Sequence, residues 1–152
     1  EQLDAPLETS RTEEFVNWGL ELREAVNETL DIEHPFSGEQ ASVSITEIYE
    51  SGDDADRSIV VFGDGQVDRS PCGTGTCAKM TLLHGAGALS VGEPYLHESI
   101  IGTQFQGRIV ERREQDDITV TVPTITGAAR ITGKHTFLKD PRDQLTGFSL
   151  SG

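Results

Sequence analysis

The segment from about Thr74 to Leu83 carries little charge and has small or apolar side chains on most of its sides. Its residues are compatible with a helix, and Gly85 and Gly87 allow that helix to end. A helix of this composition is stable in water only when neighbouring elements bury it on nearly all sides. We therefore expect one central helix, around which the rest of the chain folds.

Strand-like runs lie on both sides of this segment. Before it, residues 41–49 alternate apolar and polar side chains, and residues 58–62 (SIVVF) predict a more deeply buried strand. After it, further runs predict strands over 98–105, 107–114, 118–123, 124–133 and 134–138. Glycines that punctuate these runs predict bends or bulges at Gly102, Gly107, Gly127 and Gly133. The mixed charges of residues 111–117 predict a solvated hairpin turn.

An amphipathic helix is predicted over residues 12–30. Thr12 starts it, two glutamates follow, and the apolar face consists of Phe15, Leu20, Leu22, Val26 and Leu30. His34 precedes a proline and therefore avoids helical backbone angles. The predicted fold class is α+β: a curved, mostly antiparallel sheet wrapped around a central helix, with the first helix packed outside. A chain of 152 residues accommodates one such domain.

Charge restricts the classes of partner. The chain has 26 acidic and 12 basic residues and a net charge of -14, so it would repel a nucleic-acid backbone. An acidic excess with only three lysines is typical of proteins kept soluble in concentrated salt; an ordinary acidic cytosolic protein is the other interpretation. No apolar stretch approaches a membrane span, and the first residues do not resemble a signal peptide, so we expect a cytoplasmic protein.

The run Ser70-Pro71-Cys72-Gly73-Thr74-Gly75-Thr76 has the composition of a turn that opens a helix. Pro71 fixes the entry, and the two glycines leave the backbone uncovered. The free N–H groups at a helix N-terminus bind anions. Their partial positive charge also favours the thiolate form of a cysteine placed there. A purely structural turn is the alternative interpretation.

Other uses of the cysteines are less compatible with the spacing. On a helix, Cys72 and Cys77 lie about 7.5 Å apart along the axis and on different sides, which disfavours a disulfide. Cys77 and His84 are separated by about 10.5 Å of helix rise, more than one metal ion bridges, so no metal site is predicted. Cys77 is then expected to be a small buried core residue. The remaining histidines are expected to be surface or hydrogen-bonding residues: His34, His97 and His135.

The run from Asp68 to Thr76 (DRSPCGTGT) resembles the second catalytic motif of the proline racemase family. This family comprises proline racemases, 4-hydroxyproline 2-epimerases and trans-3-hydroxyproline dehydratases. The similarity extends from about Phe15 to Leu150 and includes Val60-Val61-Phe62, Gly92-Glu93, Glu98-Ser99-Ile100-Ile101-Gly102-Thr103, Phe105, Ile131-Thr132-Gly133 and Gly147-Phe148. The resemblance implies a lobe of the diaminopimelate-epimerase type.

The resemblance also implies a cofactor-free mechanism with two bases. One cysteine thiolate removes the α-proton of the substrate while a second cysteine thiol protonates the opposite face. Cys72 resembles the second of these cysteines. Gly73 and Thr74 resemble the backbone donors that hold the substrate carboxylate, where they would stabilise the carbanion charge. Asp68 resembles the group that pairs with the substrate ammonium or ring nitrogen, and a turn-capping carboxylate is its alternative role.

Members of the family are roughly twice as long and have two similar halves, the first of which carries a Cys-Gly-His motif. No such motif occurs in these 152 residues. We therefore expect residues 1–152 to be the second lobe alone, inactive without a partner lobe or, in a homodimer, a second copy. The dehydratase branch has threonine where this chain has Cys72, so a racemase or epimerase acting on proline or 4-hydroxyproline is favoured. Phe62 is either a pocket residue or a strand-core residue. A non-catalytic domain that binds a small carboxylate is the alternative function.

Overall fold

The computed structural model describes residues 6–138 and 140–142. Within these ranges the chain forms two α-helices, α1 (Thr12–Thr29) and α2 (Gly73–Gly85), and a 3-10 turn over Thr9–Arg11 precedes α1. The strands are β1 (Ile32–Glu33), β2 (Gln40–Ala41), β3 (Ile45–Glu50), β4 (Asp56–Phe62), β5 (Gln66–Val67), β6 (Tyr95–Ser99), β7 (Gln104–Gln115) and β8 (Ile118–Gly127). No helix in the described ranges has both the length and the hydropathy of a membrane span.

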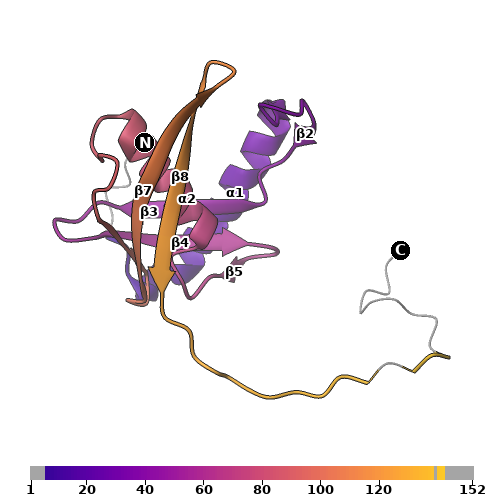
Figure 1. Cartoon of the computed structure of the whole chain (residues 1–152). Coiled ribbons are helices and arrows are strands. Elements are labelled where there is room, and N and C mark those ends of the chain that lie inside the picture. The colour runs from indigo at the N-terminus through magenta and orange to yellow at the C-terminus, as the bar shows by residue number, and fades with distance from the viewer. Residues whose placement is uncertain (1–5, 139, 143–152) are drawn as a thin grey trace.

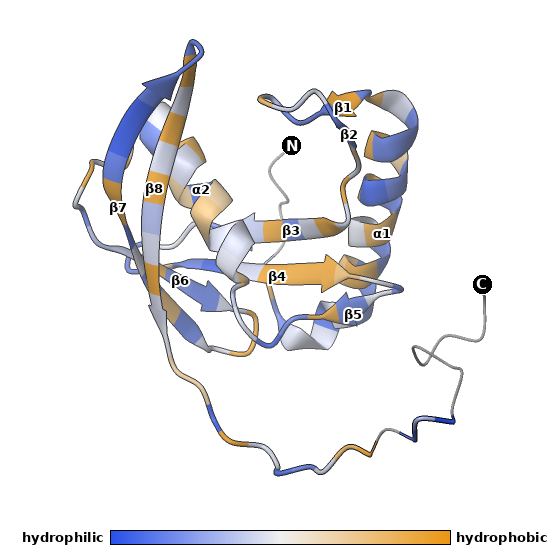
Figure 2. Cartoon of the chain, turned by 45° about the vertical axis from the view of Figure 1, so that its right-hand side comes forward, coloured by the Kyte–Doolittle hydropathy of each residue, from blue (hydrophilic) through white to orange (hydrophobic). Residues whose placement is uncertain are grey.

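Six strands form the main sheet in the order β3-β4-β6-β7-β8, with β5 paired to β4, while β1 and β2 pair separately. Of the pairs in the main sheet, β4 and β6 are parallel and the others are antiparallel. Parallel neighbours need a long crossover connection, and α2 lies within the one that joins β4 to β6. Figure 2 shows β7 and β8 turned steeply relative to β3 and β4, with α2 in the angle between them. The structure thus confirms the α+β fold class with a mostly antiparallel sheet.

The first helix packs on one face of β3 and β4. Successive side chains of a strand point to opposite faces. Thr46 of β3 points toward α1, where its hydroxyl donates to the carbonyl oxygen of Gly19 at 3.0 Å. Ile48, two residues further on, belongs to a buried cluster with Phe15 of α1. The full cluster comprises Leu7, Phe15, Ile48, Ile59 and Ile100, with Trp18 and Val67 packed against it.

The second helix packs on the opposite face, over polar side chains. Glu47 of β3 lies directly against the backbone of Gly75 in α2. Tyr49 of the same strand places its ring 2.9 Å from the Nζ atom of Lys79. Lys79 is buried and also lies 3.7 Å from Oδ2 of Asp56. Apolar contacts of α2 are made instead with the β7 side of the sheet, in a cluster of Met80, Leu89, Tyr95 and Ile109, with Leu83 and Ile125 beside it.

Most of the predicted elements are present, with shifted boundaries. The helix predicted over residues 12–30 is α1, and the strand predicted over 58–62 is β4. The strand predicted over 41–49 is divided, because Gln40–Ala41 pairs with β1 whereas Ile45–Glu50 pairs with β4. The mixed-charge run ends in a turn at Asp116 and Asp117, whose φ angles of 51° and 63° suit a tight hairpin.

The strands predicted over residues 124–133 and 134–138 are mostly wrong. β8 ends at Gly127, and residues 128–138 have no regular structure. Figure 1 shows this segment running away from the sheet, so it has no neighbouring strand to receive its backbone hydrogen bonds. The apolar side chains that suggested a strand are exposed there, including Ile131 at 96% and Phe137 at 85%.

Candidate functional site

Cys72 occupies the N-cap position of α2 with a φ of 61° and a ψ of 126°. A positive φ is uncommon for a residue with a side chain. Among the described residues other than glycine, it occurs elsewhere only in the turn of the β7–β8 hairpin. Residues persist in such conformations where their surroundings fix them, and they cluster at functional sites.

Two side chains fix the backbone that leads into this turn. Oδ1 of Asp68 accepts a hydrogen bond from the N–H of Ser70 at 2.8 Å. Oγ of Ser70 in turn accepts one from the N–H of Cys72 at 3.1 Å. Asp68 therefore has the turn-capping role that the sequence offered as its alternative. Its second oxygen, Oδ2, makes no hydrogen bond with any described residue, so capping leaves it free for another partner.

Of the four backbone N–H groups at the start of α2, two are already used in hydrogen bonds and two are not. The N–H of Thr76 donates to the carbonyl of Cys72 at 2.9 Å, and the N–H of Gly75 donates to the Cys72 sulfur at 3.5 Å. The N–H groups of Gly73 and Thr74 have no acceptor within the described part of the chain, and both residues are exposed. The predicted anion-binding donors are therefore the two that remain unused.

The Cys72 sulfur has a second polar neighbour. Oγ1 of Thr74 lies 3.3 Å from Sγ of Cys72, and either atom can be the donor. Together with the N–H of Gly75, this hydroxyl can donate to the sulfur, which is the arrangement that a thiolate would use. Cys72 itself is 8% exposed.

A second turn, over Ser99–Thr103, is tied to the first. The hydroxyl of Thr103 donates to the carbonyl oxygen of Arg69, just before Cys72. Within the turn, the hydroxyls of Ser99 and Thr103 lie 2.8 Å apart, and Gly102 adopts a φ of 81°. Both turns belong to segments that resemble the proline racemase family. The fold thus brings together motifs that lie about thirty residues apart in the sequence.

Beneath the Cys72 turn lie Glu47 and His97, neither of which was predicted from the sequence to be a site residue. His97 of β6 is fully buried, and its 2.9 Å contact with Thr76 confirms the hydrogen-bonding role, one of the two roles expected of it. Burial raises the pKa of Glu47 to about 7 and lowers that of His97 to about 4. One sequence signal was available: Glu47 falls on the strand face that also carries Val43 and Ile45, and a carboxylate in such a row indicates a buried charge.

Two predictions about α2 are wrong. Cys77, expected in the core, is half-buried and more accessible than Cys72. The helix is not buried on nearly all sides, because Ala78 is exposed and Leu82 is 70% exposed. Among the described elements, β7 and β8 contact α2 on its other side, so no described element packs over Ala78 and Leu82. Burial, together with the neighbouring Cys72, raises the pKa of Cys77.

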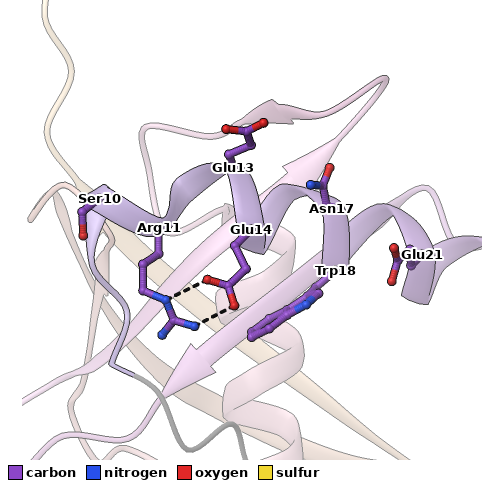
Figure 3. A pocket seen from close by; sticks show the side chains of 7 residues that line it. All are labelled: Ser10, Arg11, Glu13, Glu14, Asn17, Trp18 and Glu21. Atoms are coloured by element: carbon purple, nitrogen blue, oxygen red, sulfur yellow. Dashed lines mark hydrogen bonds and ion pairs between the residues drawn. The ribbon is translucent and has the colours of Figure 1, made fainter.

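Phe62 and a hollow along α1 are the two remaining candidates. Phe62, at the end of β4, is 39% exposed and is not a core residue. A hollow of about 510 Å³ lies along α1 and is lined by Ser10, Arg11, Glu13, Glu14, Asn17, Trp18 and Glu21. Figure 3 shows its Arg11–Glu14 ion pair beside the Trp18 ring. None of these residues belongs to the Cys72 turn.

Comparisons with known proteins agree with the motif. The model of the proline racemase family matches residues 1–149. The chain belongs to the proline racemase family. A proline racemase of Clostridioides difficile is 42% identical to it over 98% of this chain. A trans-3-hydroxy-L-proline dehydratase of Bacillus thuringiensis is 40% identical over 88% of the chain.

A solved structure has the same fold as this chain. It is a hydroxyproline epimerase from Agrobacterium vitis with bound trans-4-hydroxy-L-proline, with a TM-score of 0.76 and 31% identity. The match covers 81% of this chain and 36% of the epimerase. The chain likewise spans less than half the length of the curated relatives it matches, namely 46% of the C. difficile racemase.

Proposed function

We propose that residues 1–152 are the second of two lobes of a cofactor-independent racemase or epimerase that acts on proline or 4-hydroxyproline. The observation that carries this proposal is the position of Cys72. Its sulfur lies at the N-terminus of α2, next to the unused N–H groups of Gly73 and Thr74. The motif DRSPCGTGT and the family membership support the same reaction class.

In this proposal the substrate carboxylate binds to the N–H groups of Gly73 and Thr74. The positive end of the α2 dipole stabilises it there. The Cys72 thiolate takes the α-proton, and the electron pair left on the α-carbon delocalises into the bound carboxylate. A thiol of the other lobe gives a proton to the opposite face, which inverts the centre. In the reverse direction the two sulfurs exchange roles. The free Oδ2 of Asp68 pairs with the substrate nitrogen.

The reaction needs groups on both faces of the α-carbon, and Cys72 reaches only one of them. A second lobe would also exclude water from the site, which strengthens the interactions that hold the carbanion. Residues 1–152 by themselves should therefore not racemise or epimerise an amino acid. The alternative source of the second thiol is another copy of the same chain in a homodimer.

The test is α-proton exchange in deuterium oxide with L-proline and trans-4-hydroxy-L-proline. The two-lobed protein should incorporate deuterium at the α-carbon and change the optical rotation with one of them. Cys72→Ser in that protein should abolish inversion, whereas Cys77→Ser should leave it in place. Full activity of the Cys72→Ser variant would overturn the proposal. Turnover by residues 1–152 at low protein concentration would show that the second base is misassigned.

The burial of the Cys72 thiol favours a second candidate function, the binding of a small carboxylate without catalysis. A thiol that is only 8% exposed suits a domain that binds a small carboxylate at α2 without reacting with it. Such a domain would bind the amino acid, and the two-lobed protein would show neither exchange nor inversion. The same deuterium experiment, run together with a binding measurement, separates the two functions.

A further inference from the structure

A chain of buried polar side chains connects the first turn of α2 to the sheet. Thr76 of α2 and His97 of β6 are both fully buried, and Oγ1 of Thr76 lies 2.9 Å from Nδ1 of His97. The other ring nitrogen, Nε2, lies 3.3 Å from Oε1 of Glu47 in β3. Neither Nε2 nor Oε1 has a geometrically complete hydrogen bond within the described part of the chain. Three elements distant in sequence thus meet beneath Cys72.

The hydrogen bonds of Thr76 determine where the protons of His97 lie. The Thr76 hydroxyl donates to the carbonyl oxygen of Cys72 at 2.7 Å, and its other backbone neighbour, the Pro71 carbonyl at 3.3 Å, also only accepts. Its single hydrogen is therefore used, so Thr76 accepts from Nδ1–H of His97. In a neutral imidazole Nε2 is then an acceptor. Only a proton on Glu47 can fill the contact between Oε1 and Nε2.

The electrostatics of the site agree with this proton count. Because burial raises the pKa of Glu47 to about 7 and lowers that of His97 to about 4, both groups are uncharged between these values. The other titratable groups facing them are Lys79 of α2, Asp56 of β4, Tyr95 of β6 and Tyr49 of β3. Lys79 and Asp56 offset each other in an ion pair, and the pKa of Tyr95 is raised by burial and by Asp56. Glu47 is then the neighbouring group whose charge changes near neutral pH.

Glu47 also touches the Cys72 turn directly. A Cβ atom added to Gly75 would lie 2.3 Å from Oε2 of Glu47, so carboxyl and backbone are in contact. The N–H of that same Gly75 donates to the Cys72 sulfur. A negative charge on Glu47 would therefore lie close to the sulfur, and in a partly buried site it would oppose formation of the thiolate.

We propose that Glu47 and His97 are positioning residues for Cys72. By sharing one proton they keep the buried site beneath the Cys72 turn uncharged. Through their contacts with Gly75 and Thr76 they also hold that turn in place. This inference rests on the proposed role of Cys72 as a thiolate base. It adds that loss of the shared proton above neutral pH opposes formation of the Cys72 thiolate, so the family's thiol chemistry in this chain depends on a group outside the motif.

The test is the rate of Cys72 alkylation by iodoacetamide as a function of pH, followed by peptide mapping. Glu47→Gln keeps the size of the side chain but cannot become charged. We expect it to label Cys72 at least threefold faster than the wild-type chain at pH 8 and at an equal rate at pH 5.5, with the midpoint of its pH profile moved downward. Glu24→Gln on the exposed side of α1 removes the same charge elsewhere and should change the rates little.

The possible outcomes are distinct. A reactive Cys72 whose pH profile is unchanged by Glu47→Gln overturns this inference and leaves the proposed function standing. A Cys72 that resists alkylation at every pH in the wild-type chain overturns both. If Glu47→Gln fails to fold by circular dichroism, the ¹⁵N NMR spectrum of His97 in the wild-type chain at pH 6 decides. Protonation at Nδ1 supports the inference, and protonation at Nε2 contradicts it.

Discussion

The backbone of Gly19 in α1 lies against the side chain of Val61 in β4. A Cβ atom added to Gly19 would be 3.0 Å from both Cβ and Cγ2 of Val61 and 2.8 Å from Oγ1 of Thr46. Real Cβ atoms are almost never so close to β-branched side chains in a packed core. The separation of α1 from the sheet is therefore set by the absence of a side chain at this position.

Gly19→Ala should lower the free energy of unfolding by about 1 to 3 kcal/mol, because either the helix or the two strand residues must move. Gly85→Ala is the matched control, since it lies near the end of α2 with no atom within 4 Å of the added Cβ. There the better helix propensity of alanine should raise stability by up to about 1 kcal/mol. Urea unfolding of both variants measures the difference. Equal effects of the two substitutions would mean that α1 packs less closely against Val61 and Thr46 than these distances indicate.

Stability should fall as the pH rises from 5 through 7 because of Glu47. Its pKa is raised by burial to about 7, so the folded state holds this proton more tightly than the unfolded state does. The contribution is complete at low pH, begins to be lost above the usual glutamate value, and is gone once the pH passes 7. Between pH 5 and 8.5 the wild-type chain should lose on the order of 2 kcal/mol more than Glu47→Gln does in urea unfolding. Parallel pH dependences of the two chains would contradict a buried carboxyl.

His97 should act in the opposite direction at acid pH. Because burial lowers its pKa to about 4, the folded state favours the neutral ring. This stability is present above the ordinary histidine value and is lost as the pH falls through 4. His97→Gln, which keeps a polar group but cannot gain that charge, should lose less stability than the wild-type chain between pH 7 and 4. A steeper acid loss in the variant is the result that would oppose this assignment.

Cys72 should be alkylated before Cys77 at limiting reagent, although Cys77 is the more exposed of the two. Burial and the Cys72 charge raise the pKa of Cys77 and keep it protonated, whereas Cys72 has two donors next to its sulfur. Peptide mapping after brief treatment identifies the labelled site. Preferential labelling of Cys77 would show that exposure outweighs the helix N-terminus.

The net charge of -14 gives a prediction for salt. If the acidic excess is an adaptation to concentrated salt, screening of the repulsion between carboxylates should raise the melting temperature as KCl increases from millimolar to molar. Differential scanning calorimetry in KCl measures it. A flat or falling melting temperature identifies an ordinary acidic protein instead.

The Cys72 turn could be predicted from sequence because its determinants are local. A proline, two glycines and a following helix specify the N-terminus of α2. The hydrogen bonds accepted by Asp68 and Ser70 each join residues that are close together in the sequence. Local signals also predict α1 and β4, since each has a regular apolar pattern over one element.

Features that depend on distant pairing could not be predicted in this way. Glu47 and His97 belong to different strands, and their meeting follows from the sheet order rather than from any motif. Apolar composition alone overestimated the burial of α2, because the exposure of Leu82 depends on which elements surround the helix. The same limit applies to residues 128–138, whose strand-like pattern has no described strand to pair with.

The parallel pairing of β4 with β6 determines when the site can assemble during folding. Arg57 and Glu98, which are partners in this pairing, are 41 residues apart, and the loop that they close contains Cys72 and all of α2. Closing a loop of this length costs chain entropy before any contact compensates for it. The β3–β4 and β7–β8 hairpins have no such requirement, so we expect them to form first. Cys72 then meets Glu47 and His97 only when the two hairpins join through β6. The site is therefore a product of the last folding step.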